Sequence, residues 1–157
     1  MHINVTFTGK TDQESIKELI INYVKKLKHY STLNINEIAD IKGAKSLTND
    51  QLKAKEAEIQ LNKINERDYL ILLDEKGVHQ TSKEFAKYLQ MKMNSGIKSL
   101  HFLIGGAYGF DQKIYDRANY KISLSKMTFS HQMVRLFFIE QLYRAHTILR
   151  NEKYHHD

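Results

Sequence analysis

Cysteine, proline and tryptophan are absent from the 157 residues of the chain. The lack of cysteine excludes disulfides and thiolate metal sites. The lack of proline means that no turn and no helix end is set by a proline ring. Long apolar runs are missing as well, since no window approaches the roughly 18 uninterrupted apolar residues that a membrane-spanning helix needs. We therefore expect a protein without a membrane partner.

A secretory signal is also missing, because residues 1–10 alternate polar and apolar side chains and no basic stretch leads into an apolar one. We therefore expect the protein in the cytoplasm. The composition, 41% hydrophobic and 27% charged, is typical of a globular chain. The length fits a single domain that spans residues 1–157 and is large enough to bury a core.

Charge is biased toward one sign, with a formal net charge of +6 and a pI of about 9.3. An excess of lysine and arginine favours a polyanionic partner such as nucleic acid, because binding releases condensed counterions. Many basic proteins bind no polyanion, however. The charge by itself therefore leaves this partner open.

Apolar periodicity predicts strands and helices in alternation along the chain. The predicted strands span residues 2–7, 33–39, 69–73, 100–104 and 120–124. The predicted helices span 12–27, 48–65, 81–96, 111–118 and 131–150, with Asp12, Thr48 and Thr81 as amino-terminal caps. This order predicts an α/β fold with a mostly parallel sheet and helices on both faces.

The predicted helix 131–150 carries apolar side chains in nearly every direction around its axis. A helix that is apolar on all sides must be buried on all sides. The sheet can cover one side, and in so short a chain we expect a second copy to cover the other. The alternative is a helix at the centre of a monomer.

Two glycine-bearing segments follow predicted strands. Gly105–Gly109 comes directly after a buried strand, at the place where open parallel sheets bind ligands and where glycine lets the backbone approach them. Its spacing fits neither the dinucleotide fingerprint nor a phosphate-binding P-loop, and a plain turn explains it equally well. Leu73–Gly77 could form a second pocket wall, although locally it resembles a charged turn between a strand and a helix.

The segment 124–131 is less ordinary, because it mixes apolar side chains with hydroxyls and a cation before the long helix. That mixture suits a pocket for an adenosine-like ligand. The alternative is a plain helix start with Ser130 as its cap. At the other end, a metal site made of His155, His156 and Asp157 would consist of adjacent residues in an untethered tail, so we predict no metal.

Taken together, three motifs resemble one family. They are FLIGGAYG at 102–109, LSKMTFSHQMVRLFFIEQLYRA at 124–145 and the ending YHHD. The chain resembles the small SPOUT-class methyltransferases that modify N3 of a pseudouridine in bacterial 23S ribosomal RNA. The match runs over the entire chain and includes Gly9 and Lys10 after the first strand. It departs at Ser130, where the family has proline, and at His156, where a basic residue is common.

The resemblance implies a C-terminal trefoil knot, a homodimer, and a pocket for S-adenosyl-L-methionine formed by the knot loops. It implies that the cofactor contacts are Leu73, Gly105, Gly106, Leu124, Ser125, Lys126, Met127, Thr128 and Phe129. It implies that the substrate is placed by His131, Arg135, Arg144, Tyr154 and His155. The expected partner is 23S ribosomal RNA within the assembled ribosome, rather than DNA.

Several questions stay open at this point. His155 could be the base that removes the N3 proton of pseudouridine, since an unperturbed histidine titrates near pH 6.5. Arg135 or Arg144 could instead stabilise the deprotonated base or grip phosphate. We expect the tail to fold over the neighbouring subunit's pocket. A SPOUT methyltransferase of transfer RNA and a non-catalytic RNA-binding protein are the alternative functions.

Overall fold

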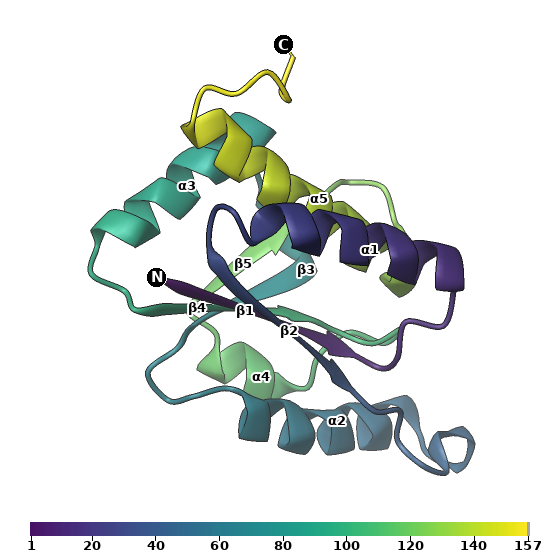
Figure 1. Cartoon of the computed structure of the whole chain (residues 1–157). Coiled ribbons are helices and arrows are strands. Elements are labelled where there is room, and N and C mark those ends of the chain that lie inside the picture. The colour runs from purple at the N-terminus through teal and green to yellow at the C-terminus, as the bar shows by residue number, and fades with distance from the viewer. Residues whose placement is uncertain (157) are drawn as a thin grey trace.

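The computed structural model describes residues 1–156, which form a five-stranded parallel sheet with the order β2-β1-β4-β3-β5. The strands are β1 (His2–Thr8), β2 (Thr32–Ile38), β3 (Tyr69–His79), β4 (Ser99–Ile104) and β5 (Tyr120–Ser123). The helices are α1 (Glu14–Leu27), the 3₁₀ turn η1 (Ala44–Ser46), α2 (Asn49–Lys63), α3 (Ser82–Asn94), α4 (Gln112–Arg117) and α5 (His131–Leu149). Figure 1 shows α1, α3 and α5 on one face and α2 and α4 on the other. The predicted fold class is confirmed.

Both faces of the sheet are apolar at its centre because successive side chains of a strand point to opposite faces. Ile71 and Leu73 of β3 join the larger core beneath α1, α3 and α5. Leu70 and Leu72 of the same strand join a smaller core against α2 and α4. The run of leucines and isoleucine in β3 is thus explained by burial on both sides.

Helix α5 lies between α1 and α3 and also contacts β4. Phe138, Ile139 and Leu142 are fully buried within the single chain. Phe137 remains 36% exposed, and it lies near Phe129, with the two ring centroids 5.0 Å apart. Much of the apolar circumference of α5 is therefore covered inside one chain, and the side around Phe137 stays partly exposed.

Hydrogen bonds confirm three of the predicted helix starts. Thr48 and Thr81 each form a capping box, with Gln51 and Glu84 as the respective reciprocal partners. Ser130 caps α5 by accepting a hydrogen bond from the backbone N–H of Met133. The predicted cap at Asp12 is wrong, because α1 begins at Glu14 after Gln13 and has no side-chain cap. The backbone N–H of Asp12 instead donates to the side chain of Gln132 in α5.

Strand β3 is longer than predicted, because it continues through the supposed turn 73–77 to His79. The pairing of β3 with β5 shifts register between Leu73 and Val78. At Gly77 a Cβ atom would lie 2.4 Å from the backbone carbonyl carbon of Ile122. Glycine therefore lets the irregular part of β3 lie directly against β5.

After β5 the chain returns from the edge of the sheet to its centre, where α5 packs. The trefoil knot that the family resemblance implies stays a prediction. Within residues 1–156 no helix combines the length and apolar character that crossing a bilayer requires. No group of three or more histidine or acidic side chains in this range could hold a metal ion, and Asp157 of the tail motif lies outside the described residues.

Candidate functional site

A cleft of about 1010 Å³ opens at the carboxyl ends of β3, β4 and β5. This edge is where parallel sheets bind their ligands. Every residue that the resemblance implies for the cofactor lines the cleft, together with His131. The lining residues are Lys53, Leu73–Lys76, His79, Ile104–Phe110, Tyr115, Ile122–His131 and Val134.

The wall after β4 is made of backbone. A Cβ atom on Gly105 would lie 3.1 Å from the ring of Phe110, and one on Gly106 would lie 3.1 Å from the carboxylate of Glu56. Gly109 closes the loop with a φ of +78°, in the left-handed region that favours glycine. Glycine thus allows the peptide groups themselves to face the cleft.

The wall formed by residues 124–130 is held by short polar contacts. The hydroxyl of Ser123 donates to the carbonyl of Ser125 over 2.9 Å, and the hydroxyl of Ser125 accepts from the backbone N–H of Met127 over 2.9 Å. Met127 and Phe129 remain 76% and 38% exposed. Apolar side chains exposed on an ordered loop beside a cleft are typical of a surface that a ligand or partner covers.

The third wall is the extension of β3. Asp74 accepts a hydrogen bond from the backbone N–H of Lys76 over 2.8 Å and another from the hydroxyl of Tyr115 over 2.6 Å. Burial and the bond to Asp74 raise the pKa of Tyr115, so that this hydroxyl remains a donor. The carboxylate therefore joins the end of β3 to α4.

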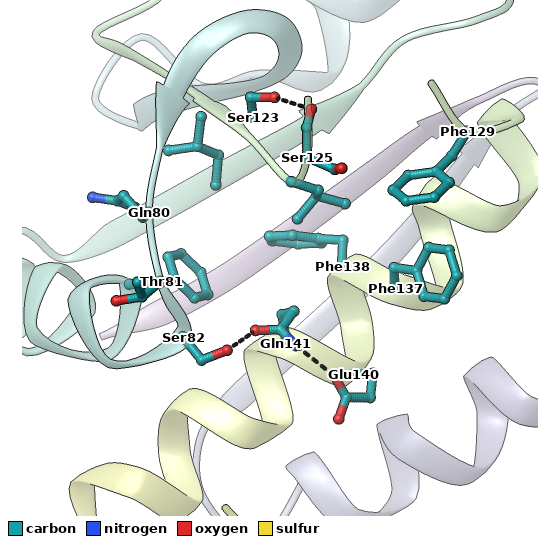
Figure 2. Close-up of a pocket in the computed structure, with 13 residues that line it drawn as sticks. Gln80, Thr81, Ser82, Ser123, Ser125, Phe129, Phe137, Phe138, Glu140 and Gln141 are labelled. Atoms are coloured by element: carbon teal, nitrogen blue, oxygen red, sulfur yellow. Dashed lines mark hydrogen bonds between the residues drawn. The ribbon is translucent and has the colours of Figure 1, made fainter. Parts of the chain in front are cut away.

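A second hollow of about 410 Å³ lies on the other side of residues 122–125, against the first turn of α3 and the middle of α5. Its floor is aromatic, with Phe85 and Phe138, while the hydroxyl of Ser82 donates to the side-chain oxygen of Gln141 over 2.7 Å. Figure 2 shows this bond beside Glu140. Since both hollows share residues 122–125 and Phe129, a change in this segment affects both.

A polar cluster joins the C-terminal half of α5 to the tail, and its Glu140 also lines the second hollow. Arg144 donates to Glu140 from Nε over 3.0 Å and from one terminal nitrogen over 2.6 Å. Its other terminal nitrogen lies 3.5 Å from Nδ1 of His155, and the hydroxyl of Tyr154 donates to Glu140 over 3.0 Å. At a rise of about 1.5 Å per residue, His131 and Arg144 lie about 20 Å apart along α5.

Arg135 has a third location, because it is fully buried and does not line the cleft. Its guanidinium donates to the carbonyl of Thr8 over 2.7 Å and to the hydroxyl of Thr11 over 3.0 Å. Gln132 adds a bond of 2.9 Å to the carbonyl of Lys10. The start of α5 therefore holds the loop after β1. Burial and the charge of Arg135 lower the pKa of His131, so the His131 ring is neutral at physiological pH.

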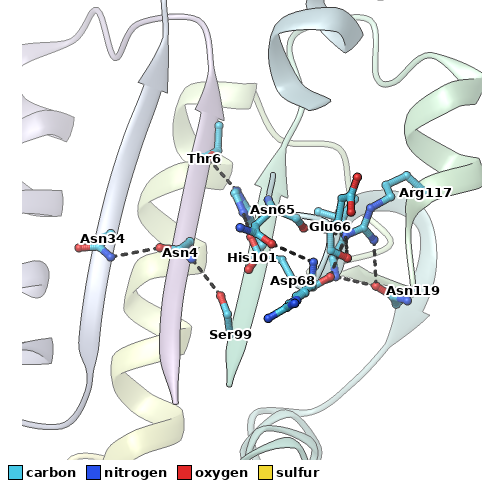
Figure 3. A network of polar contacts seen from close by, with 12 residues as sticks. Asn4, Thr6, Asn34, Asn65, Glu66, Asp68, Ser99, His101, Arg117 and Asn119 are labelled. Atoms are coloured by element: carbon cyan, nitrogen blue, oxygen red, sulfur yellow. Dashed lines mark hydrogen bonds and ion pairs between the residues drawn. The ribbon is translucent and has the colours of Figure 1, made fainter. Parts of the chain in front are cut away.

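A separate polar network lies away from the cleft, on the face covered by α2 and α4 (Figure 3). His101 contacts Thr6 over 2.9 Å and Asp68 over 3.1 Å. Burial would raise the pKa of Asp68, but hydrogen bonds from Ser99 and His101 hold it below its usual range. Although a hydroxyl, a histidine and a carboxylate are aligned, Thr6 is fully buried and His101 is 1% exposed. The network therefore joins strands rather than meeting a substrate.

Comparison with known proteins agrees with this geometry. A family model described as "Predicted SPOUT methyltransferase" matches residues 1–155. Relatives named "Ribosomal RNA large subunit methyltransferase H" are similar over nearly all of both chains. The Flavobacterium johnsoniae protein is 55% identical over 99% of each chain, and that of Parabacteroides distasonis is 51% identical over 100% of each. The chain belongs to the SPOUT methyltransferase family.

In this SPOUT methyltransferase, the residues predicted from the sequence fall into separate groups. The cofactor group is brought together in the cleft with His131. Arg144, Tyr154 and His155 meet one another beside the C-terminal half of α5, and none of them lines the cleft. Arg135 does not line the cleft, although its charge acts on His131. Within one chain the predicted residues thus occupy separate places.

Two members of the polar cluster were missed by sequence reasoning. Glu140 stands four residues before Arg144, a spacing that brings opposite charges together on a helix, and this signal was available in the sequence. Tyr23 of α1 lies 3.2 Å from the hydroxyl of Tyr154, although 131 residues separate them. No local pattern could have found that contact.

Proposed function

We propose that the chain transfers a methyl group from S-adenosyl-L-methionine to N3 of a pseudouridine in 23S ribosomal RNA, in the cytoplasm and on the assembled ribosome. The observation that carries the proposal is the convergence of the glycine loop, the end of β3 and residues 124–129 on one cleft. The relatives named as methyltransferases of the large ribosomal subunit support the RNA class.

The cleft fits the cofactor in its volume and in the chemical groups that line it. Its volume is at the upper end of the range for small-molecule sites, and its walls offer peptide groups at Gly105 and Gly106 and apolar side chains at Met127 and Phe129. When bound, the sulfonium of the cofactor supplies an electrophilic methyl group. The task of the chain is then to hold the acceptor nitrogen in line with that methyl, which can contribute roughly 7–11 kcal/mol of barrier reduction.

The acceptor side of the site is proposed to come from a second copy. Arg144 lies about 15 Å along α5 from Val134, which lines the cleft of the same chain, and Arg144, Tyr154 and His155 do not line that cleft. An antiparallel pair of α5 helices would bring the tail cluster of one copy to the cleft of the other. The exposed ring of Phe129 lies in the segment before α5, and that of Phe137 lies on α5 itself. Such a pair of helices would bury both rings.

The proton on N3 must leave before or during transfer. A guanidinium can only donate hydrogen bonds, so the contact of Arg144 with Nδ1 of His155 requires the tautomer whose hydrogen is on Nε2. In this tautomer the hydrogen of the His155 ring is on Nε2, and the ring lies beside the Arg144 cation. The cluster is therefore suited to stabilise the deprotonated base, and His155 as general base is the competing role. An activity profile of His155→Ala that keeps the acidic limb of the wild type excludes that role.

Labelled cofactor identifies the substrate. The protein is incubated with unmodified 70S ribosomes, separate 50S subunits or transfer RNA, and the modified nucleoside is located by mass spectrometry. We expect label at N3 of a pseudouridine in 23S ribosomal RNA. Label in transfer RNA alone would favour the transfer RNA alternative. Absence of label together with absence of cofactor binding by calorimetry would favour the non-catalytic binder.

Mixing two inactive variants tests the shared site. Arg144→Ala damages the tail cluster, and Gly105→Val places side-chain atoms against the ring of Phe110 in the cleft wall. Co-refolded as a mixture, they should recover about one quarter of the wild-type rate, because half of the dimers are mixed and each mixed dimer holds one complete site. No recovery, with mixed dimers shown to be present, would mean that each site belongs to one chain.

A further inference from the structure

Glu140, in the middle of α5, is the centre of the polar cluster that joins this helix to the tail. Its Oε1 accepts both hydrogen bonds from Arg144 and the bond from the hydroxyl of Tyr154, and its Oε2 accepts one of 2.8 Å from Gln141. The side chains of Glu140 and Arg144 are only 17% and 24% exposed. One carboxylate thus joins the helix to the tail.

The carboxylate fixes which part of Arg144 faces outward. Two of the three guanidinium nitrogens are bonded to Glu140, and the third is the one beside His155. The hydrogen bonds from Arg144 to Glu140 raise the pKa of this arginine. Arg144 is therefore held both charged and oriented, whereas a free arginine side chain would sample many rotamers.

The same carboxylate fixes the hydroxyl of Tyr154. A carboxylate can only accept, so the single hydroxyl hydrogen of Tyr154 is directed to Glu140, and Tyr23 must be the donor in its contact with Tyr154. Burial and the bonds to Tyr23 and Glu140 raise the pKa of Tyr154. The ring of Tyr154 also packs edge-on against Tyr143, and the guanidinium of Arg144 lies over it at 4.7 Å. The tail is thus ordered by its own chain.

We propose that Glu140 is a positioning residue, which holds Arg144 and Tyr154 in the arrangement that receives the target nucleotide. This inference rests on the proposed function. A carboxylate facing RNA would otherwise repel phosphate, but here its charge is matched by Arg144. The Glu140 carboxylate therefore acts by orienting Arg144 and Tyr154. Removing it affects the reaction only through these two side chains.

Glu140→Gln tests the proposal, because it keeps the size of the side chain and removes the charge. We expect kcat/KM with ribosomes to fall about 10- to 100-fold, while the cofactor Kd stays within about twofold. The matched control is Glu58→Gln, which removes one exposed carboxylate from α2 on the opposite face of the sheet and should keep wild-type kinetics. Unchanged kinetics in Glu140→Gln, or a parallel loss of cofactor binding and thermal stability, would overturn the proposal.

A double-mutant cycle separates positioning from a general structural effect. If Glu140 acts through Arg144, adding Glu140→Gln to Arg144→Ala should cause no more than about a further twofold loss. Fully additive losses would contradict that route. Proteolysis of residues 150–156 gives a readout without activity: Glu140→Gln should be cleaved faster there than the wild type, and equal rates contradict the proposal. If the wild type methylates no RNA, the proposed function fails, and the proteolysis result alone decides whether Glu140 orders the tail.

Discussion

The cleft at the sheet edge and the polar cluster around Glu140 of α5 are built in different ways. The cleft wall consists of peptide groups exposed by glycine and of a loop held by serine hydroxyls. The cluster consists of long polar side chains that meet around one carboxylate. A backbone wall is set by the path of the chain, while a side-chain cluster depends on every member. The two regions should therefore respond differently to substitution.

Removing the tail should have the largest effect. Deleting Tyr154–Asp157 removes the hydroxyl that donates to Glu140 and leaves Arg144 without its neighbour His155. We expect methylation to fall by a factor of about 10³ while cofactor affinity, measured by calorimetry, stays within a few fold. Lys153→Ala, which alters an exposed residue beside the cluster, serves as the control. Full activity of the truncated protein would remove the tail from the site.

The second largest effect should be a loss of folding stability at acidic pH, caused by His146 near the C-terminal end of α5. Burial and the charge of Arg150 lower the pKa of His146 to about 4. The unfolded chain, whose histidine has a pKa near 6.5, binds more protons between these values. The contribution of the neutral His146 to the free energy of unfolding is therefore fully present above about pH 6.5. It falls by up to about 3 kcal/mol as the pH drops to about 4.

His146→Phe checks this sign, since Nε2 of His146 is buried without a hydrogen-bond partner and the ring lies beside Tyr30. Urea unfolding between pH 7 and 4 should show a shallower loss of stability in the variant. Part of the slope should remain, because burial also lowers the pKa of His101. His29→Gln, at an exposed position, is the control. A slope as steep as that of the wild type would show that His146 is not the titrating group.

The substitution Gly77→Ala should damage the cleft, with a smaller effect than the two changes above. The added Cβ would lie 2.4 Å from the backbone of Ile122, so the end of β3 must move away from β5. Overpacking of this kind costs about 1–3 kcal/mol, and we expect a lower thermal midpoint together with weaker cofactor binding. Val78→Ala is the matched control, because it changes the next residue of β3, which is exposed and does not line the cleft, and adds no atoms. Equal effects of the two changes would contradict a backbone-built wall.

Sequence reasoning succeeded where the signal was local. The threonine caps are determined by residues within a few positions of one another and are confirmed, while the cofactor role of the glycine loop and of the segment 124–130 stays a prediction. It failed where the cause was distant: the extension of β3 depends on its pairing with β5, and the burial of Arg135 depends on Thr8 and Thr11, more than 120 residues earlier. The position of Arg144 and His155 relative to the cleft likewise follows from the length of α5, which periodicity predicts without showing what meets at its end.

Ser130→Pro should have the smallest effect of the set. Ser130 has a φ of −61°, which a proline ring also adopts, so the backbone needs no change. The substitution loses the cap bond to Met133, worth about 1 kcal/mol, and gains about 0.4–1 kcal/mol by restricting the unfolded chain. We expect a thermal midpoint near that of the wild type and methylation within about twofold. A large loss of activity with an unchanged midpoint would mean that the hydroxyl of Ser130 itself takes part in the cleft. In that case the wall would depend on a side chain as well as on backbone.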